Sequence, residues 1–331
     1  MRTWLTLGLL LIAASALGAC VSGMVSMPGT SYAGPAVASE DAALVETLRA
    51  DVTHLAVDIG ERNIVNTPAK LEETQAWLTQ RLGALGYEVT AQDYPVGERK
   101  VANLVVEKKG TTLANELIVI GAHYDTAPGN PGADDNGSGV AALLSLAQHF
   151  ATREPMRTVR FIFFTNEEPP FFRKATMGSE VSAKRSREAN EAIKAMISLE
   201  TMGYFTDEPN TQHYPFPFSL FYPSKGNFIA FVADTESREL IHAAVTAFRA
   251  SEAKVASEGA SVPAAIEGVD WSDHGPYWRQ GYRALMVTDT APNRNPNYHE
   301  ASDLPGTLDF TRLAHVTIGL RAVIDALANA P

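Results

Sequence analysis

Cysteine is almost absent from this chain of 331 residues, and so is any surplus of positive charge. The one cysteine, Cys20, has no second cysteine with which to pair, so an internal disulfide is excluded. Lysine and arginine total 27 against 38 acidic residues, which gives a net charge of -11. A chain without a basic surplus cannot neutralise many phosphates, and we therefore expect no nucleic-acid partner.

Apolar runs long enough to cross a membrane are lacking as well. The stretch from Trp4 to Ala16 is mostly apolar, but polar residues and a glycine interrupt it and it is shorter than the roughly 20 residues that span a bilayer. Arg2 precedes this stretch and Leu17-Gly-Ala-Cys20 follows it. In this order of features the N-terminus resembles a bacterial lipoprotein signal peptide.

The resemblance implies that residues 1–19 are removed and that a lipid is attached to the thiol of Cys20. The protein would then be exported and would contact the membrane through lipidated Cys20 only. The alternative is an ordinary signal peptide, which would leave a soluble secreted protein. Residues 20–39 are rich in glycine, serine, proline and alanine, so we predict a flexible tether there.

The rest of the chain, residues 40–331, alternates strand-like and helix-like patterns without internal repeats, and predicts one α/β domain. Mostly apolar runs, typical of strands buried on both faces, lie at 116–121, 159–165, 195–199 and 284–288. Helical patterns lie at 41–59, 68–85, 140–150, 236–252 and 307–328. The alternation favours a layered fold with a mainly parallel central sheet, and it leaves the oligomeric state open.

Histidines and carboxylates follow four of these apolar runs. His123, Glu167, Glu168, Glu200 and His299 each lie at or shortly beyond the carboxyl end of a predicted strand. In an open α/β sheet these ends meet at one edge, where so many carboxylates would repel one another. A divalent cation removes that repulsion, and imidazole with carboxylate is a ligand set that suits zinc.

The motifs that contain these residues resemble those of the M28 family of zinc metallopeptidases, in which two metal ions act together. The matching motifs, in the family's order, are His123-Tyr-Asp125, Gly132-Ala-Asp-Asp-Asn-Gly-Ser-Gly139, Asn166-Glu-Glu168, Ser198-Leu-Glu200 and Asn297-Tyr-His299. The resemblance covers the chain from about residue 40 onward. It implies a zinc-peptidase-like fold, also called phosphorylase-like, with a mixed sheet of about eight strands sandwiched between helices in a single catalytic domain.

Carried over position by position, the resemblance implies two zinc ions bridged by Asp135. Glu168 and His299 would complete one zinc site, and His123 and Glu200 the other. Family members carry either aspartate or glutamate at the position of Glu200. The glutamate side chain is longer than aspartate and has the same charge, so the assignment as a metal ligand stands.

The same resemblance makes Glu167 the general base of the reaction. Asp125 is expected to hold the imidazole of His123 in one tautomer. The family also implies a cis peptide bond between Asp135 and Asn136. For His274 the sequence leaves two interpretations open, a place near the substrate or a structural role.

The leading functional hypothesis is an aminopeptidase that removes N-terminal residues from a peptide substrate. Alternatives on the same fold are a carboxypeptidase, a dipeptidase or a glutaminyl cyclase, which uses a single zinc. The presence of both His123 and Glu200 favours two metals. A binding module without catalysis is the remaining alternative, but such a module is expected to lose ligands or the base, and none is missing here.

Overall fold

The computed structural model describes residues 23–39 and 41–330. The predicted signal peptide, residues 1–19, and Cys20 lie outside the described residues. Among the described residues, no helix combines the length and apolar character needed to cross a membrane.

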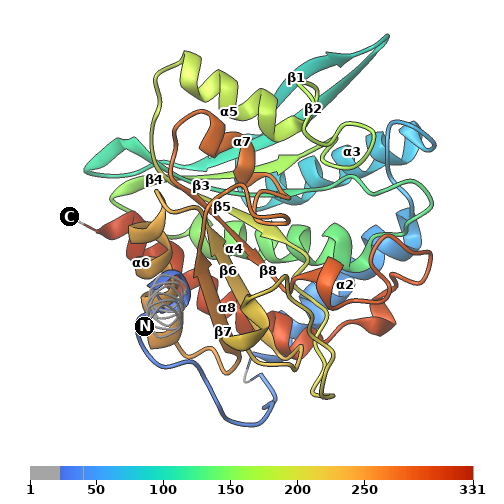
Figure 1. Ribbon diagram of the computed structural model, residues 1–331. Helices are drawn as coiled ribbons and strands as arrows, with labels where there is room; N and C mark the ends of the chain where they lie inside the picture. Colours follow the sequence, from blue (N-terminus) through green and yellow to red (C-terminus); the bar gives the residue numbers. More distant parts are fainter. Residues whose placement is uncertain (1–22, 40, 331) are drawn as a thin grey trace, which may run out of the picture.

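One eight-stranded sheet runs through the centre of the molecule (Figure 1), in the order β1-β2-β4-β3-β5-β8-β6-β7. The strands are β1 (Thr90–Val96), β2 (Arg99–Lys108), β3 (Leu113–His123), β4 (Arg157–Phe164), β5 (Ala192–Glu200), β6 (Phe228–Ala233), β7 (Ala256–Ser261) and β8 (Ala284–Thr288). Strands β4, β3, β5 and β8 are parallel neighbours. The pair β1 and β2 joins β4 antiparallel, and the parallel pair β6 and β7 joins β8 antiparallel. The prediction of a mixed, mainly parallel sheet of about eight strands is confirmed.

Helices cover both faces of this sheet. The α-helices are α2 (Ala42–Thr53), α3 (Pro68–Ala84), α4 (Gly139–Ala151), α5 (Gly178–Glu188), α6 (Arg238–Ala250), α7 (His274–Arg279) and α8 (Phe310–Asn329). One or two turns of π-helix or 3-10 helix form η1 (His54–Ile59), η2 (Ala133–Ser138), η3 (Phe218–Leu220), η4 (Ala291–Asn293) and η5 (Pro305–Thr307). Helices α2, α3, α4, α6 and α8 contribute to the larger core on one face, and α5 and α7 to a smaller core on the other.

The apolar run of β3 shows why this strand lies in the middle of the sheet. Ile118 and Ile120 point into the larger core, whereas Leu117 and Val119 point into the smaller one. Both faces of the strand are therefore buried, which requires apolar residues without alternation. The chain leaves β3 toward β4 on one side and later returns as β5 on the other. This reversal of strand order beside β3 opens a crevice at the carboxyl ends of the strands.

Neither β7 nor the short helix α7 was predicted from the sequence. Strand β7 has the sequence Ala-Ser-Glu-Gly-Ala-Ser, which lacks the β-branched and aromatic residues that mark a strand. Pairing with β6, from Phe228 with Ala256 to Ala233 with Ser261, stabilises this strand in place of a local preference for β structure.

Part of the segment predicted to be a flexible tether, residues 20–39, packs against the domain. The Arg249 side chain on α6 donates hydrogen bonds to the backbone carbonyls of Pro28 and Gly29, at 3.0 and 3.2 Å. The hydroxyl of Ser31 accepts a hydrogen bond from the backbone N–H of Ser257 on β7, at 2.8 Å. The composition of this segment did not reveal these contacts, because the groups that hold it come from α6 and β7.

Candidate metal centre

Four neighbouring parallel strands deliver the predicted site residues to one place. His123 is the last residue of β3, and Glu200 is the last residue of β5. Glu167 and Glu168 follow the end of β4. His299 lies in the loop after β8. The convergence expected from the sequence is therefore present.

The side chains form two groups that share Asp135. His123, Asp135 and Glu200 make one group, and Asp135, Glu168 and His299 make the other, with the candidate ligand atoms of each group within 4.8 Å of one another. The Nε2 atom of His123 lies 3.3 Å from Oδ1 of Asp135 and 3.4 Å from Oε2 of Glu200. The Nε2 atom of His299 lies 3.1 Å from Oδ2 of Asp135 and 3.2 Å from Oε2 of Glu168. Each oxygen of the Asp135 carboxylate thus faces a different histidine.

Three polar atoms of these groups are buried and lack a hydrogen-bond partner in the described residues. They are Nε2 of His123, Oδ1 of Asp135 and Oε1 of Glu168. Burial and the neighbouring carboxylate of Asp135 raise the pKa of Glu168 to about 8. Burial also raises the pKa of Glu200 above its usual range. Unpaired donors that converge in a buried, carboxylate-rich site fit a bound divalent cation, and imidazole with carboxylate suits Zn²⁺.

Glu167 lies beside the two groups but belongs to neither. Its Oε2 atom is 4.0 Å from Nε2 of His123, and the residue is buried. Burial, together with the charges of Glu200 and Glu168, holds the pKa of Glu167 well above its usual range. A carboxylate that lies beside the ligand groups without belonging to them is placed to accept a proton from a molecule bound there, as a general base does.

Asp125 connects the β3 end to the β4 end. Its carboxylate accepts hydrogen bonds from the backbone N–H groups of Glu167 and Glu168, at 3.1 and 3.2 Å. The Nδ1 atom of His123 lies 3.2 Å from the backbone carbonyl oxygen of Asp125 and 3.5 Å from its carboxylate. Asp125 therefore positions the turn that carries Glu167 and Glu168 in addition to contacting the imidazole.

The loop that leads to Asp135 is held by a buried arginine that the sequence did not reveal. The guanidinium of Arg62 donates to the backbone carbonyls of Tyr124, Pro131 and Gly132, at 2.8, 2.7 and 2.9 Å. Gly132 has a φ of +65°, and a Cβ atom there would collide with the carbonyl oxygen of Asp135. Only glycine fits at this position. The peptide bond between Asp135 and Asn136 is cis, as the family resemblance implied.

Asp303 holds the other side of this loop. Its two carboxylate oxygens accept hydrogen bonds from the backbone N–H groups of Asp134 and Asp135, at 2.9 and 3.1 Å. Asp303 lies 168 residues from Asp135 along the chain. The sequence gives no local signal for this contact, apart from the closeness of Asp303 to His299.

We expect that Asp303→Ala weakens zinc binding by about 10- to 100-fold, because partners that orient metal ligands contribute on this order. The backbone N–H groups of Asp134 and Asp135 would lose their acceptor, and the loop would no longer fix Asp135. Titration of zinc into the metal-free protein measures the change. Glu300→Ala is the matched control, since Glu300 is exposed and lies three residues away. Equal zinc affinity in the two variants would contradict the role of Asp303.

The segment before α7, which lies on the face of the sheet with the smaller core, contacts the Glu200 carboxylate. The hydroxyl of Ser272 donates to Oε2 of Glu200 at 2.7 Å. Both carboxylate oxygens of the adjacent Asp273 are buried without a hydrogen-bond partner in the described residues. Burial raises the pKa of Asp273 to about 7. The imidazole of His274 contacts the backbone carbonyl of Val269 at 2.8 Å, which favours the structural interpretation of this residue.

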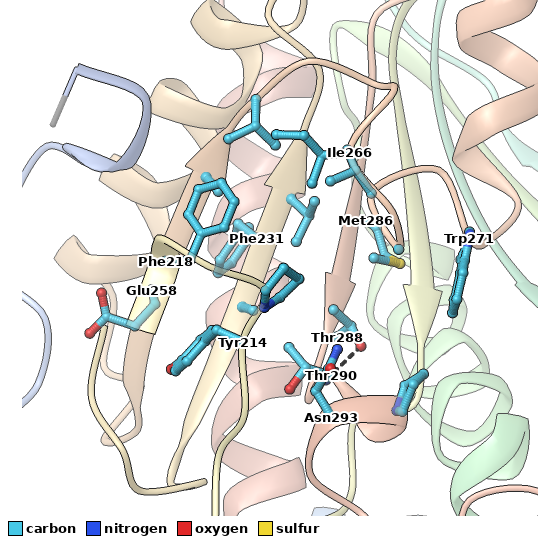
Figure 2. A pocket seen from close by; sticks show the side chains of 18 of the residues that line it. Tyr214, Phe218, Phe231, Glu258, Ile266, Trp271, Met286, Thr288, Thr290 and Asn293 are labelled. Atoms are coloured by element: carbon cyan, nitrogen blue, oxygen red, sulfur yellow. Dashed lines mark hydrogen bonds between the residues drawn. The ribbon is translucent and has the colours of Figure 1, made fainter. Parts of the chain in front are cut away.

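An apolar pocket with a volume of about 160 Å³ adjoins the metal centre. Glu200 and Tyr298 line it on the side of the metal centre, and Tyr298 stacks on His299 with a ring separation of 4.0 Å. Figure 2 shows the aromatic and aliphatic side chains that surround this space, which come from β6, β8 and the connecting loops. They include Tyr214, Phe218, Ile266, Trp271 and Met286. The segment 212–234 provides one wall of this pocket.

A comparison with protein-family models adds the decisive observation, because residues 103–324 match the model of peptidase family M28. The chain belongs to peptidase family M28. It is a zinc-dependent exopeptidase, and its substrates are peptides. Among curated proteins, this M28 peptidase is 34% identical over 284 residues to the uncharacterized protein YfbL of Escherichia coli K12, covering 83% of this chain and 86% of YfbL.

Solved structures with the same fold include a zinc aminopeptidase and a cyclase. The zinc aminopeptidase BSAP of Bacillus subtilis superimposes with a TM-score of 0.68 at 12% identity, over 86% of this chain and 95% of BSAP. The glutaminyl cyclase of Porphyromonas gingivalis superimposes with a TM-score of 0.63 at 18% identity, over 85% of this chain and 97% of the cyclase. At these identities, the two structures establish the fold of this M28 peptidase and do not distinguish between the two activities.

Proposed function

We propose that this M28 peptidase is an aminopeptidase with two zinc ions that share Asp135 as a ligand. The observation that carries the two-ion proposal is the orientation of the Asp135 carboxylate. Its Oδ1 atom faces His123 at 3.3 Å, and its Oδ2 atom faces His299 at 3.1 Å. A carboxylate with one oxygen in each of two ligand groups is suited to bridging two cations. Glu200 would complete the ligands on the His123 side, and Glu168 those on the His299 side.

The zinc ions, when bound, would polarise the scissile carbonyl and lower the pKa of a water molecule that attacks it. Glu167 is the general base in this proposal. It would accept a proton from the attacking water and pass it to the nitrogen of the leaving amine. Asp125 would keep Glu167 in place through its hydrogen bond to the backbone N–H of that residue.

The charge of the site supports an aminopeptidase over a carboxypeptidase. Six buried carboxylates surround the two histidines, those of Asp125, Asp135, Glu167, Glu168, Glu200 and Asp273. Their negative charge favours the free ammonium group of a peptide N-terminus. Neither lysine nor arginine is among the described residues that line the adjoining pocket, so nothing there would pair with the carboxylate of a peptide C-terminus.

The test of this activity is a set of matched substrates with the zinc-loaded protein. We expect cleavage of leucine amide and of a peptide that begins with leucine, and no cleavage of the N-acetylated forms. A substrate that begins with glutamine separates the cyclase, which releases ammonia and leaves a pyroglutamyl peptide of full length. Cleavage from the C-terminus, or cyclisation without hydrolysis, would refute the aminopeptidase proposal.

The pocket beside the metal centre supports a preference for a large apolar side chain at the substrate N-terminus. Figure 2 shows the Glu258 carboxylate at the edge of the lining residues and turned away from the apolar side chains. Burial of an apolar side chain in such a space is favourable, whereas a charged side chain would lose its hydration without a partner.

Filling this pocket is expected to shift the substrate preference from large to small N-terminal side chains. Ala230 lies on β6 and lines the pocket, so Ala230→Phe would place an aromatic ring in it. We expect kcat/KM for a leucyl substrate to fall by roughly 10- to 100-fold relative to an alanyl substrate, since small changes in pocket volume discriminate on this order. Steady-state kinetics on both substrates measures the ratio. Ala230→Ser is the control of similar volume, and an unchanged ratio in Ala230→Phe would place the substrate side chain elsewhere.

We further propose that the protein is exported and anchored to a bacterial membrane by a lipid on Cys20. The support is the resemblance of the N-terminus to a lipoprotein signal peptide, since Cys20 lies outside the described residues. Mass spectrometry of the purified protein tests the proposal. The expected mature chain begins at Cys20 and carries the added mass of its lipid, and an unmodified cysteine would refute the anchor.

A further inference from the structure

Three large apolar side chains project from one short loop between β5 and β6. Phe216, Leu220 and Phe221 are 83%, 72% and 40% exposed. Single exposed apolar residues are common, but three within six residues form a patch that usually marks an interaction surface. We call residues 214–222 the aromatic loop.

The aromatic loop has a defined conformation, so the exposure of its apolar residues is built into the fold. The rings of Tyr214 and Tyr222 stack with a centroid separation of 5.5 Å, and Phe218 stacks on Tyr222 at 6.4 Å. Backbone hydrogen bonds from Phe218 to Pro215 and from Leu220 to Pro217 close the turns, at 2.9 and 3.0 Å. The inner rings hold the loop against the domain and leave Phe216 and Leu220 exposed.

The N-terminal segment of the chain docks beside this loop. The hydroxyl of Tyr222 donates to the backbone carbonyl of Gly259 on β7, at 2.6 Å. The side chain of Met27 lies against Gly259 so closely that its Cγ would be 2.8 Å from a Cβ atom built there. One residue of β7 therefore touches both the aromatic loop and the N-terminal segment. Figure 1 shows this segment (blue) running along the side of the molecule on which the loop after β5 (yellow) projects.

This docking limits the distance between the domain and a lipid on Cys20. Cys20 precedes Met27 by seven residues, and an extended chain spans at most about 3.5 Å per residue, which gives about 25 Å. Arg249 fixes the segment at Pro28 and Gly29. A lipid on Cys20 would therefore hold the edge formed by β7 and the aromatic loop close to the membrane surface.

We propose that the aromatic loop is a membrane-binding element, with Phe216, Leu220 and Phe221 inserted into the interfacial region of the bilayer that holds the lipid anchor. The proposal goes beyond the peptidase activity and rests on the lipidation of Cys20 proposed above. Aromatic and aliphatic side chains at the level of the lipid headgroups provide a second contact, which fixes the orientation that a single anchor leaves free. Tyr214 and Phe218 of the same loop line the substrate pocket. The wall of this pocket would therefore lie next to the lipid, and peptides at the membrane surface would be the accessible substrates.

The test uses site-specific fluorescent labels on the full chain, produced in a bacterial host and reconstituted into phosphatidylcholine vesicles. Phe216→Cys carries the label at the loop tip, and Val57→Cys carries it at another apolar residue, which is 57% exposed. We expect a nitroxide quencher on the lipid to reduce the emission of the label at position 216 by roughly twofold or more, as for a group at the headgroup level, and to leave position 57 unchanged. The parent chain, whose one cysteine is Cys20, reports by its own labelling whether that thiol is blocked.

Each outcome bears on a different step. Quenching at position 216 alone, with the parent unlabelled, supports the proposal. Absence of quenching at position 216, or equal quenching at position 57, overturns it. Labelling of the parent chain shows a free Cys20 and overturns the anchor together with the orientation. A change at position 216 that depends on protein concentration and occurs without vesicles indicates a second copy of the chain as the partner, which also overturns the proposal.

Peptidase activity provides a separate readout. Phe216→Ser combined with Leu220→Ser removes apolar surface outside the pocket lining, so hydrolysis of leucine amide is expected to stay unchanged. On vesicles, this double variant should no longer have a fixed orientation. A fluorescent label on Phe221→Cys in the same variant should then no longer be quenched by the nitroxide lipid. A parent protein that binds vesicles correctly but cleaves no peptide would refute the aminopeptidase and leave the membrane-binding element intact.

Discussion

Glu167→Gln is expected to lower kcat by about 10²- to 10⁴-fold and to leave the zinc content unchanged, because a positioned general base contributes on this order. The amide has the shape of the carboxylate but cannot accept a proton from water at neutral pH. The Glu167 side chain lies next to the two ligand groups and is a member of neither, so its loss removes no proposed ligand. Zinc analysis and steady-state kinetics on leucine amide measure the two quantities.

Two comparisons make this result specific. Glu300→Gln changes an exposed glutamate next to His299 and should keep full activity, since its side chain is not among the proposed ligands. Glu168→Gln, one residue away, should weaken the zinc site that contains His299 as well as lower activity. If Glu167→Gln loses zinc and Glu168→Gln retains it, the roles of the two adjacent glutamates are exchanged.

The convergence of the site residues could be predicted from the sequence because of the strands that carry them. His123 and Glu200 end mostly apolar runs, and such runs identify strands buried on both faces of a parallel sheet. Parallel strands place their carboxyl ends at one edge, so residues far apart in sequence meet there. The fold class and the grouping of these side chains follow from that pattern and from the M28 motifs. The chemical roles and the count of two zinc ions stay predictions until the variants are measured.

The residues that hold the ligands could not be predicted, because their partners are distant in sequence and carry no pattern. Arg62 donates to backbone carbonyls. Every residue type has a backbone carbonyl, so the sequence does not indicate which residues Arg62 contacts. Asp303 accepts from two backbone N–H groups and is subject to the same limit. Ser272 contacts Glu200 because the segment before α7 lies against the end of β5. Such contacts depend on tertiary structure alone.

The N-terminal segment illustrates a second limit of sequence patterns. Its composition predicts a flexible linker, yet residues 27–31 bind α6 and β7 through backbone carbonyls and one serine hydroxyl. Composition describes how much apolar surface a segment can bury, and it does not describe hydrogen bonds that a neighbouring arginine offers. The greatest distance that the chain allows between the domain and Cys20 is consequently shorter than for a free linker of residues 20–39.

Asp135→Asn is expected to have the largest effect on metal binding, because Asp135 is the one residue common to both ligand groups. The amide replaces one of its two anionic oxygens with an NH₂ group, which cannot bind a cation. We expect weaker binding at both zinc sites and a loss of peptidase activity of about 10³-fold or more, since the ions contribute several kcal/mol and each 1.36 kcal/mol is tenfold in rate. Zinc titration into the metal-free protein, followed by calorimetry, measures the number of sites and their affinities.

The variants of the other carboxylates distinguish a bridge from an ordinary ligand. Glu200→Gln should weaken the site that contains His123, and Glu168→Gln the site that contains His299, each leaving the second site near its original affinity. Asp135→Asn alone should weaken both, because its two oxygens face the two histidines at 3.3 and 3.1 Å. If Asp135→Asn weakens one site only, Asp135 is a ligand of a single ion. A parent protein that is fully active with one bound zinc would contradict the two-ion proposal. It would favour the single-zinc chemistry of a glutaminyl cyclase, which the substrate that begins with glutamine tests.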